Sequence, residues 1–402
     1  MENCLIWGAG TIGSSSVLID ILSQNYHVMA YCDSNISQRE IINGLYLINI
    51  QNVDKYLEKE KISVILIAVM DRSIIKEILK VIEDKNLNHI RILNLYDAEY
   101  SQMENLYLMN MHKKMKFQWD IDFENQSKIW IDSIASEIQY WINGYHSTKG
   151  KFIDEYLLNN QFEKYFPEYR EFAEELGNND IVLDIGGGII SKFGCITERG
   201  CILNVRTVDP LAHWYNQLLP NNIEQNKKCE FGLFEFIGNF YDKESVDCVL
   251  INNALDHCID PFKSIIGCLY ILRVNKKVGM LHRRAEAVYE KYTGMHKWNI
   301  DYNAELHLLI WNQENAMDLT EALRDIAEIE VTPIGEQTLR EKQNIKVVIT
   351  KKRSFELEQY IDLKKEQYLL TNLINCLMKY FAENDFSKIY AELNSIKWRN
   401  YK

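Results

Sequence analysis

The chain has 402 residues, 47% apolar and 25% charged, so it is long enough for two or three globular domains of ordinary composition. Its formal net charge of −12 argues against non-specific nucleic-acid binding, which depends on neutralising phosphates. No apolar run is long enough to cross a bilayer, and nine cysteines without paired short spacing favour free thiols in a cytoplasmic protein over disulfides or a zinc site.

Residues 1–96 are predicted to form a small Rossmann-like domain. A strand at residues 4–7 leads into a GxGxxG turn, a helix is expected at 14–23, and a second strand follows at 28–32. This is the dinucleotide-binding fingerprint in its proper context, with an acid closing the second strand. A bound NAD-like nucleotide is one hypothesis, and plain packing of helix on strand is the other. The residues that would hold the nucleotide are Gly8, Gly10, Gly13 and Asp33.

The remainder of this segment alternates strands and helices. Strands are expected at residues 62–69 and 90–95, and helices at 53–59 and 73–85. With Asp33-Ser-Asn35, then Asn43-Gly44 and the helix at residues 53–59, the segment resembles a small domain that is attached to glycan-biosynthesis enzymes such as sugar acetyltransferases, glycosyltransferases and methyltransferases. The resemblance covers residues 1–96 and implies a domain too short to carry a catalytic half of its own.

Residues 97–177 are predicted to form a helical connector, because glycine is scarce and apolar residues recur at helical spacing. Further helix is expected at residues 156–166 and 169–176. The connector either packs on the next domain or covers a bound ligand as a lid. The expected apolar face comprises Ile129, Ile131, Ile134, Ile138, Trp141 and Ile142. The lid residues would be Trp141, Tyr145 and His146.

A glycine turn organises the second half of the chain. The apolar run at residues 181–185 predicts a buried parallel strand, which ends in three successive glycines. A second apolar run, residues 201–208, ends in an acid. Glycines let a ligand approach the backbone closely, and an acid that closes the next strand takes ribose hydroxyls. This order predicts an adenosine site contacted by Asp184, Gly186, Gly187, Gly188 and Asp209.

Residues 247–257 are predicted to form a further strand with polar residues at its carboxyl end, where ligands bind in such sheets. The order of these segments resembles the class I S-adenosylmethionine-dependent methyltransferases over residues 178–352. The resemblance implies S-adenosylmethionine as the cofactor. It also implies that Glu235 lies near the adenine and that Asn253 contacts the cofactor from the strand end.

Three histidines and one carboxylate follow the predicted strand ends. An alcohol acceptor of a methyl group benefits from a base, and histidine is the usual choice near neutral pH. The predicted catalytic residues are His257, His296 and Asp256. Their spacing does not match a metal site, so none is predicted. The alternative is a divalent ion held by Asp256, His257 and Asp260.

Residues 294–299, Gly-Met-His-Lys-Trp-Asn, resemble a Gly-Leu-His-Gln-Trp-Asn segment of methyltransferases encoded with bacterial surface-polysaccharide enzymes. This resemblance implies a sugar or a nucleotide-linked sugar as the acceptor. Guanidinium groups suit phosphate or carboxylate, and an aromatic face suits a sugar ring. The predicted acceptor contacts are His282, Arg283, Arg284 and Trp298.

The predicted fold is α/β, with two Rossmann-like doubly wound sheets in residues 1–96 and 178–353, the connector at 97–177 and a helical tail at 354–402. The tail is expected to pack on the domain or to form a homodimer. Its apolar residues are Tyr368, Leu369, Leu373, Leu377 and Tyr380.

The leading functional hypothesis is O-methylation of a sugar or polysaccharide precursor. The alternatives are an NAD-dependent oxidoreductase centred on the first glycine turn and a non-catalytic ligand-sensing or scaffolding protein.

Overall fold

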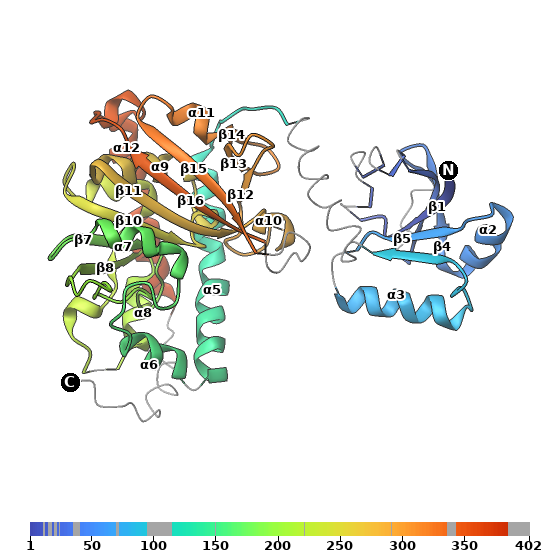
Figure 1. Cartoon of the computed structure of the whole chain (residues 1–402), viewed down its shortest axis with the longest axis horizontal. Helices are drawn as coiled ribbons and strands as arrows, with labels where there is room; N and C mark the ends of the chain where they lie inside the picture. The colour runs from blue at the N-terminus through green and yellow to red at the C-terminus, as the bar shows by residue number, and fades with distance from the viewer. Residues whose placement is uncertain are drawn as a thin grey trace. The chain divides into compact units, whose positions relative to one another are not determined.

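The computed structural model divides into two compact units, one of residues 1–115 with 334–343 and one of residues 116–333 with 344–402 (Figure 1). It describes residues 1–10, 13–14, 18–19, 22–23, 25–34, 41–69, 72–94, 115–148, 150–220, 222–290, 292–335 and 343–384, without the side chains of 72, 73, 145, 146 and 289. Within these ranges, no helix has the length and apolar character needed to span a membrane.

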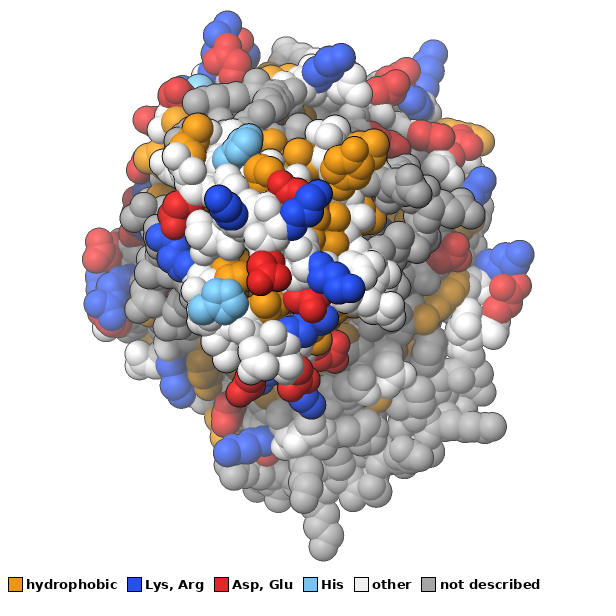
Figure 2. Space-filling view, turned by 90° about the vertical axis from the view of Figure 1, so that its right-hand side faces the viewer, with side chains coloured by type: hydrophobic (Ala, Val, Ile, Leu, Met, Phe, Trp, Pro, Cys, Tyr) orange, Lys and Arg blue, Asp and Glu red, His pale blue; other side chains and the backbone are white. Residues whose placement is uncertain are grey.

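The first unit is a six-stranded sheet in the order β3-β4-β2-β1-β5-β6. The neighbouring strands pair in parallel, except that β3 pairs antiparallel with β4. The strands are β1 (Glu2–Trp7), β2 (Tyr26–Asp33), β3 (Ile41–Ile42), β4 (Leu45–Asn49), β5 (Val64–Ile67) and β6 (Arg91–Asn94). The helices are α2 (Val53–Lys59) and α3 (Arg72–Asp84), and the helix expected at residues 14–23 lies mostly outside the described residues. On the face shown in Figure 2, acidic and basic side chains are interspersed.

The second unit contains a seven-stranded sheet in the order β15-β16-β11-β10-β7-β8-β9. Neighbours from β11 to β9 pair in parallel, and β16 pairs antiparallel with β11. The strands are β7 (Ile181–Ile185), β8 (Asn204–Asp209), β9 (Glu230–Phe231), β10 (Val246–Asn252), β11 (Leu272–Arg283), β15 (Ala327–Ile334) and β16 (Asn344–Lys351). The predicted fold class, α/β with two Rossmann-like sheets, is confirmed.

Both faces of the second sheet are buried, which suits the continuous apolar runs of its strands. Leu183 and Ile185 of β7 belong to one core cluster together with α9 (Pro261–Ile271), whereas Val182 belongs to a cluster on the opposite face. That opposite face is covered by Tyr169 and by α7 (Arg170–Glu175). Successive side chains of a strand point to opposite faces, so one apolar run supplies both cores.

A third layer is formed by helices that pack beside the carboxyl ends of the strands. α5 (Phe123–Thr148) and α12 (Leu363–Glu383) share one core cluster with α6 (Lys151–Leu157) and α8 (Ala212–Leu218). A three-stranded antiparallel sheet completes the second unit. Its strands are β12 (Asn299–Tyr302), β13 (Leu308–Trp311) and β14 (Ala316–Asp318), with α10 (Glu286–Tyr289) and α11 (Leu319–Leu323) beside them. The short 3-10 turns are η1 (Ile50–Asn52), η2 (Pro167–Tyr169), η3 (Gln225–Lys227), η4 (Phe234–Asn239), η5 (Leu255–His257) and η7 (Leu357–Gln359).

Three local predictions are wrong. The helix expected at residues 156–166 ends at Leu157, because residues 160–162 instead bond to the backbone of Ile196. Ile129 is 38% exposed, outside the buried face of α5, and Tyr368 is 56% exposed on α12. In both helices the apolar face is narrower than the sequence suggested.

Candidate active site

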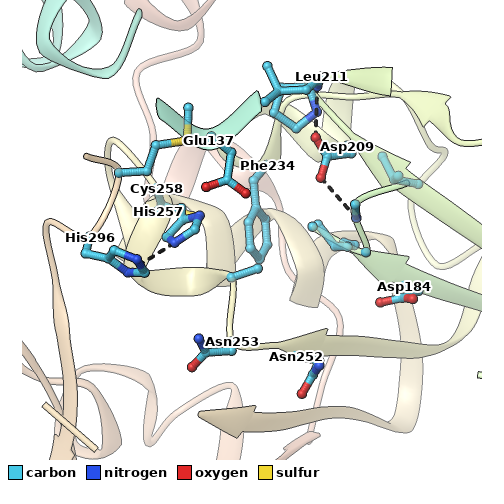
Figure 3. A pocket seen from close by; sticks show the side chains of 18 of the residues that line it. Glu137, Asp184, Asp209, Leu211, Phe234, Asn252, Asn253, His257, Cys258 and His296 are labelled. Carbon is cyan, nitrogen blue, oxygen red and sulfur yellow. Dashed lines mark hydrogen bonds between the residues drawn. The ribbon is translucent and has the colours of Figure 1, made fainter. Parts of the chain in front are cut away.

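A cavity of about 720 Å³ opens at the carboxyl ends of β7, β8, β10 and β11 (Figure 3). Its floor is the glycine turn after β7 and the polar residues after β10. Glu137 and Trp141 of α5 and Leu373 of α12 contribute further walls. The two helices that the sequence left as connector and tail therefore enclose the region where this type of sheet binds ligands.

The glycine turn has no room for side chains. Gly186 and Gly188 have φ of +71° and +72°, which L side chains rarely adopt. A Cβ at Gly187 would lie 2.7 Å from Asp184 Oδ2, and one at Gly188 would lie 2.6 Å from Trp141 Cζ2. The turn therefore depends on glycine both for its backbone conformation and for the close approach of α5.

Asp209 closes β8 and is tied to the turn. Its carboxylate accepts the N–H of Leu211 at 2.8 Å and the N–H of Gly188 at 3.3 Å (Figure 3). Burial, with the carboxylate of Glu137 nearby, raises the pKa of Asp209 to about 7. Burial also raises the pKa of Asp184 to about 6. Two carboxyl groups that ionise reluctantly therefore face the region predicted for an adenosine.

Glu235 and Asn253 line the cavity and also hold its framework. Glu235 Oε1 accepts the N–H of Ile259 at 2.5 Å, which fixes the loop before α9, and burial raises its pKa. Asn253 has a left-handed backbone with φ +49°, and its Oδ1 accepts the N–H of Arg283 at 3.0 Å. Asn253 therefore joins the ends of β10 and β11 at the edge of the cavity.

Asp256, His257 and His296 come together in a partly buried cluster whose two histidines line the cavity. Asp256 Oδ2 lies 2.7 Å from His296 Nδ1 and 3.7 Å from His257 Nε2. His296 Nδ1 lies 3.2 Å from His257 Nε2 (Figure 3). The backbone N–H groups of Lys297 and Trp298 donate to the carbonyl of Asp256, which brings this distant segment to η5.

His282, which is 1% exposed, lies next to Asp256 on the buried side of the cluster. His282 Nε2 accepts the N–H of Leu255 at 3.2 Å, so its ring proton lies on Nδ1, 4.0 Å from Asp256 Oδ1. Burial lowers the pKa of His282 to about 4 and keeps the ring neutral. For His296, burial opposes the charge, but the bond to Asp256 raises its pKa.

Two predicted acceptor contacts do not line the cavity. Trp298 is 2% exposed, stacks on Trp119 at 4.9 Å and donates its indole N–H to the carbonyl of Cys258. Arg284 is buried and forms an ion pair of 2.6 Å with Asp301 of β12. Arg284 anchors the end of β11 to the small sheet, and Trp298 packs in the core, so neither side chain reaches the cavity where the predicted acceptor contact would be made. Arg283 does line the cavity, with an exposed side chain.

Three cavity residues were not predicted as contacts, or only as a lid. Trp141 lies against Gly188 and donates its indole N–H to Glu137 Oε1 at 2.8 Å. Glu286 lines the cavity with a side chain 5% exposed. Glu137 and Trp141 are four residues apart, which places them on the same face of a helix, and this spacing could have paired Glu137 with the predicted lid residue Trp141. The side chains of Tyr145 and His146, the other proposed lid residues, lie outside the described residues.

The glycine turn of the first unit is accounted for in part by packing. A Cβ at Gly13 would lie 1.7 Å from the carbonyl oxygen of Gly8, and one at Gly8 would lie 2.6 Å from Val69 Cγ2. A Cβ at Gly10 would meet no described atom within 4 Å. Asp33 Oδ2 accepts the N–H of Ala9 at 2.7 Å. Residues 11 and 12 of the turn lie outside the described residues.

No protein-family model matches the chain, and no curated protein matches it. Similar solved structures include the 1,6-didemethyltoxoflavin-N1-methyltransferase of Burkholderia thailandensis with bound 1,6-didemethyltoxoflavin and S-adenosylhomocysteine. That match has 14% identity and a TM-score of 0.33, and it covers 60% of this chain and 94% of that one.

A SAM-dependent methyltransferase of Methanosarcina mazei matches with 17% identity and a TM-score of 0.30, covering 47% of this chain and 99% of that one. The UDP-D-quinovosamine 4-dehydrogenase of Vibrio fischeri matches with 22% identity and a TM-score of 0.19, covering 23% of this chain and 76% of that one. At these low TM-scores, the inferred function rests on the residues of the site.

Proposed function

We propose that the second unit transfers a methyl group from S-adenosylmethionine to an oxygen atom of a small acceptor. The observation that carries this proposal is a single cavity with two chemically different ends. One end is the glycine turn with Asp209, and the other is the cluster of Asp256, His257 and His296. A cofactor site beside a histidine–carboxylate cluster is the arrangement that group transfer to a hydroxyl requires.

At the donor end, the backbone of Gly186–Gly188 passes the cofactor closely and Asp209 accepts the ribose hydroxyls. Its carboxylate already faces the turn through the N–H of Gly188. Glu137 and Trp141 of α5 cover the donor from the side opposite the sheet. These two side chains would shield one side of the sulfonium from water.

At the acceptor end, the reaction is an in-line displacement. The bond between methyl carbon and sulfur breaks and sulfur keeps the electron pair, while the acceptor oxygen forms the new bond and loses its proton to the cluster. Alignment of the two partners supplies much of the rate. The cluster raises the fraction of acceptor that is deprotonated.

The acceptor that we propose is a sugar or a nucleotide-linked sugar of surface-glycan biosynthesis. Arg283 offers an exposed guanidinium at the rim for a phosphate or carboxylate. The likeness of residues 294–299 to a segment of surface-polysaccharide methyltransferases supports the sugar.

Calorimetric titration of the full chain with S-adenosylmethionine tests the donor site. Asp209→Ala should weaken binding by about 1–3 kcal/mol, or roughly 5- to 150-fold, because hydrogen bonds to a charged group are lost. Asp33→Ala, the corresponding change in the first unit, distinguishes the two glycine turns. Unchanged affinity in Asp209→Ala with weakened affinity in Asp33→Ala would refute the assignment to the second unit.

A further inference from the structure

Three side-chain atoms converge on one point beside the cavity. Asp256 Oδ2, His296 Nδ1 and His257 Nε2 form a triangle with edges of 2.7, 3.2 and 3.7 Å. When an ion is bound by nitrogen and oxygen at about 2.0–2.1 Å, neighbouring ligand atoms lie about 3.0 Å apart in octahedral and about 3.4 Å apart in tetrahedral geometry. The three measured edges bracket these values.

Hydrogen bonding alone does not use all three atoms well. The proton shared by His296 Nδ1 and Asp256 Oδ2 forms the hydrogen bond of 2.7 Å. His296 Nδ1 then has no second proton or lone pair to offer His257 Nε2, which lies 3.2 Å away. The two rings stand edge to face at 78°, a favourable ring arrangement that does not itself pair the two nitrogens. A cation would accept one lone pair from each of the three atoms.

A second observation comes from the buried carboxylates. Within the described part of the chain, Asp256 Oδ1 has no hydrogen-bond partner although the side chain is only 1% exposed. Glu286 Oε2, in the same cavity, also has none. Carboxylate oxygens without a partner are costly to bury, and a positive ion beside them removes that cost.

We propose that Asp256, His257 and His296 bind one divalent transition-metal ion of the Zn²⁺ type. Two imidazoles and one carboxylate suit such ions, whereas Mg²⁺ and Ca²⁺ prefer oxygen ligands throughout. His257 and His296 are 22% and 26% exposed towards the cavity, so a three-residue ligand set keeps an open position there.

His282 flanks the proposed ligand set. Its Nδ1 lies 4.0 Å from Asp256 Oδ1, which is beyond hydrogen-bond distance, so this contact leaves the carboxylate oxygen without a hydrogen bond. Asp260, the third ligand in the alternative set drawn from the sequence, instead caps α9 by accepting the N–H of Lys263. The third ligand is instead His296, which is 39 residues from His257 in sequence but has its Nδ1 only 3.2 Å from His257 Nε2.

The chemical role of the ion rests on the proposed methyl transfer, whereas its binding does not. The acceptor hydroxyl would occupy the open position, and the ion would lower the pKa of that hydroxyl. With the three side chains bound to the ion, the proton would leave to water in the cavity and not to a free histidine, and the oxygen would then attack the methyl carbon. This role favours acceptors whose hydroxyl can reach the open position of the ion.

Titration of chelator-stripped full chain with Co²⁺ alone, followed by absorption and calorimetry, tests the site. We expect one ion per chain with a spectrum of nitrogen and oxygen ligands. His257→Ala and His296→Ala should each weaken binding by at least about 10- to 100-fold, the loss seen when even an outer partner of a metal ligand is removed. Both side chains are partly exposed, and circular dichroism checks that the variants fold.

His307→Ala is the matched control. His307 Nδ1 lies 2.7 Å from Asp318 Oδ2, the same distance as in the His296–Asp256 pair, but no further histidine or acid of the described residues completes a ligand set there. That variant should bind Co²⁺ as the wild type does. Zn²⁺ should also raise the melting temperature of the wild type and not that of His296→Ala, because a ligand that binds the folded state stabilises it.

Three results would overturn the proposal: thiolate-to-metal charge-transfer bands, unchanged Co²⁺ affinity in His257→Ala, or equal losses in His307→Ala. The measurement needs no methyl donor, so it stands whether or not S-adenosylmethionine binds. If the donor binds and methyl transfer survives full removal of the ion, the metal's proposed role in catalysis is wrong while the donor assignment holds.

Discussion

Asp184 and Asp209 are buried carboxyl groups at the ends of two neighbouring strands. Their pKa values, raised by burial to about 6 and about 7, compare with an ordinary value of 3.8. Glu137 of α5 adds a third carboxylate beside Asp209, and the N–H groups of Leu211 and Gly188 act in the opposite direction. The folded, ligand-free protein therefore holds protons on these two acids up to a higher pH than the unfolded chain does.

This arrangement predicts that the ligand-free protein loses stability as pH rises. A carboxyl whose folded pKa is raised contributes stability below its ordinary pKa and loses it as pH rises through the folded value. The loss therefore begins near the ordinary value of 3.8 and is complete near pH 6 for Asp184 and near pH 7 for Asp209. We expect the free energy of unfolding to fall by roughly 1–4 kcal/mol between pH 5.5 and pH 8, an order-of-magnitude figure from the size of the shifts.

Urea unfolding at several pH values measures this fall. Asp209→Asn cannot ionise at that position, so it should flatten the pH dependence between pH 5.5 and pH 8. Saturating S-adenosylmethionine should flatten it as well, because ribose hydroxyls would stabilise the charged carboxylate. A variant with the same slope as the wild type would show that Asp209 does not titrate in this window.

At this scale, the sequence predicted the residues that follow strands and missed those that depend on packing. Asp209, Asp256 and His257 stand at strand ends, which meet at one edge of a parallel sheet. Arg283 and Arg284 look equivalent in sequence, but consecutive side chains leave a strand on opposite sides. Arg283 therefore reaches the cavity while Arg284 pairs with Asp301 of a small sheet that the sequence did not reveal.

Among the elements, α12 is docked by an ion pair as well as by its apolar face. Lys263 Nζ of α9 lies 2.6 Å from Glu366 Oε2, and both side chains are 8% exposed. The ammonium group also lies 3.7 Å above the ring of Phe236. Leu373 lies about two helical turns beyond Glu366 on α12 and lines the cavity, so docking of this helix positions part of the site.

Removing one partner of this pair should be strongly destabilising. Lys263→Met leaves Glu366 charged and buried, which typically costs about 3–5 kcal/mol. The double variant Lys263→Met with Glu366→Leu removes both charges and should recover most of the loss. Chemical denaturation of the three proteins measures the free energies of unfolding.

Lys379→Ala is the control, because its pair with Glu383 on the same helix is exposed and should contribute little. A Lys263→Met protein as stable as Lys379→Ala would mean that apolar packing alone holds α12. A double variant as unstable as the single one would show instead that Glu366 acts through contacts other than Lys263.

The elements missed from the sequence are short and are defined by distant partners. β12 and β13 have four buried residues each; β13 shows no alternation of polar and apolar side chains, and β12 alternates over too short a run to mark a strand. β4 was missed because its main partner is distant in sequence. It pairs in parallel with β2, and its antiparallel pairing with the neighbouring β3 covers only two residues of each strand. Long strands and amphipathic helices such as β2, α3 and α5 carried their own signals.

At the scale of the whole molecule, the chain contains two glycine turns, each followed by an acid that closes the next strand. Asp33 accepts the N–H of Ala9 in the first unit, and Asp209 accepts the N–H of Gly188 in the second. The backbone contact is alike, but the surroundings differ. In the second unit a cavity lies over the turn, bounded by helices that the sequence left as connector and tail.

Asp33 would decide which dinucleotide the first unit binds. An acid at the position of Asp33 favours a free ribose 2′-hydroxyl and disfavours a 2′-phosphate. We therefore expect the full chain to bind NADH more tightly than NADPH. Asp33→Ala should narrow that difference and leave affinity for S-adenosylmethionine unchanged. Fluorescence titration with each dinucleotide, in the wild type and in the variant, measures both effects.

A contrary result has a clear physical meaning, because packing alone already requires two of the glycines. A Cβ at Gly8 or Gly13 would collide with atoms of the same unit, so these residues would be needed even without a ligand. Gly10 is different, since a Cβ there would meet no described atom within 4 Å. Gly10→Ala should therefore leave folding intact and weaken NADH binding if the nucleotide passes over the turn. No dinucleotide binding at about millimolar concentration, with a stable Gly10→Ala protein, would make the first turn a packing device only.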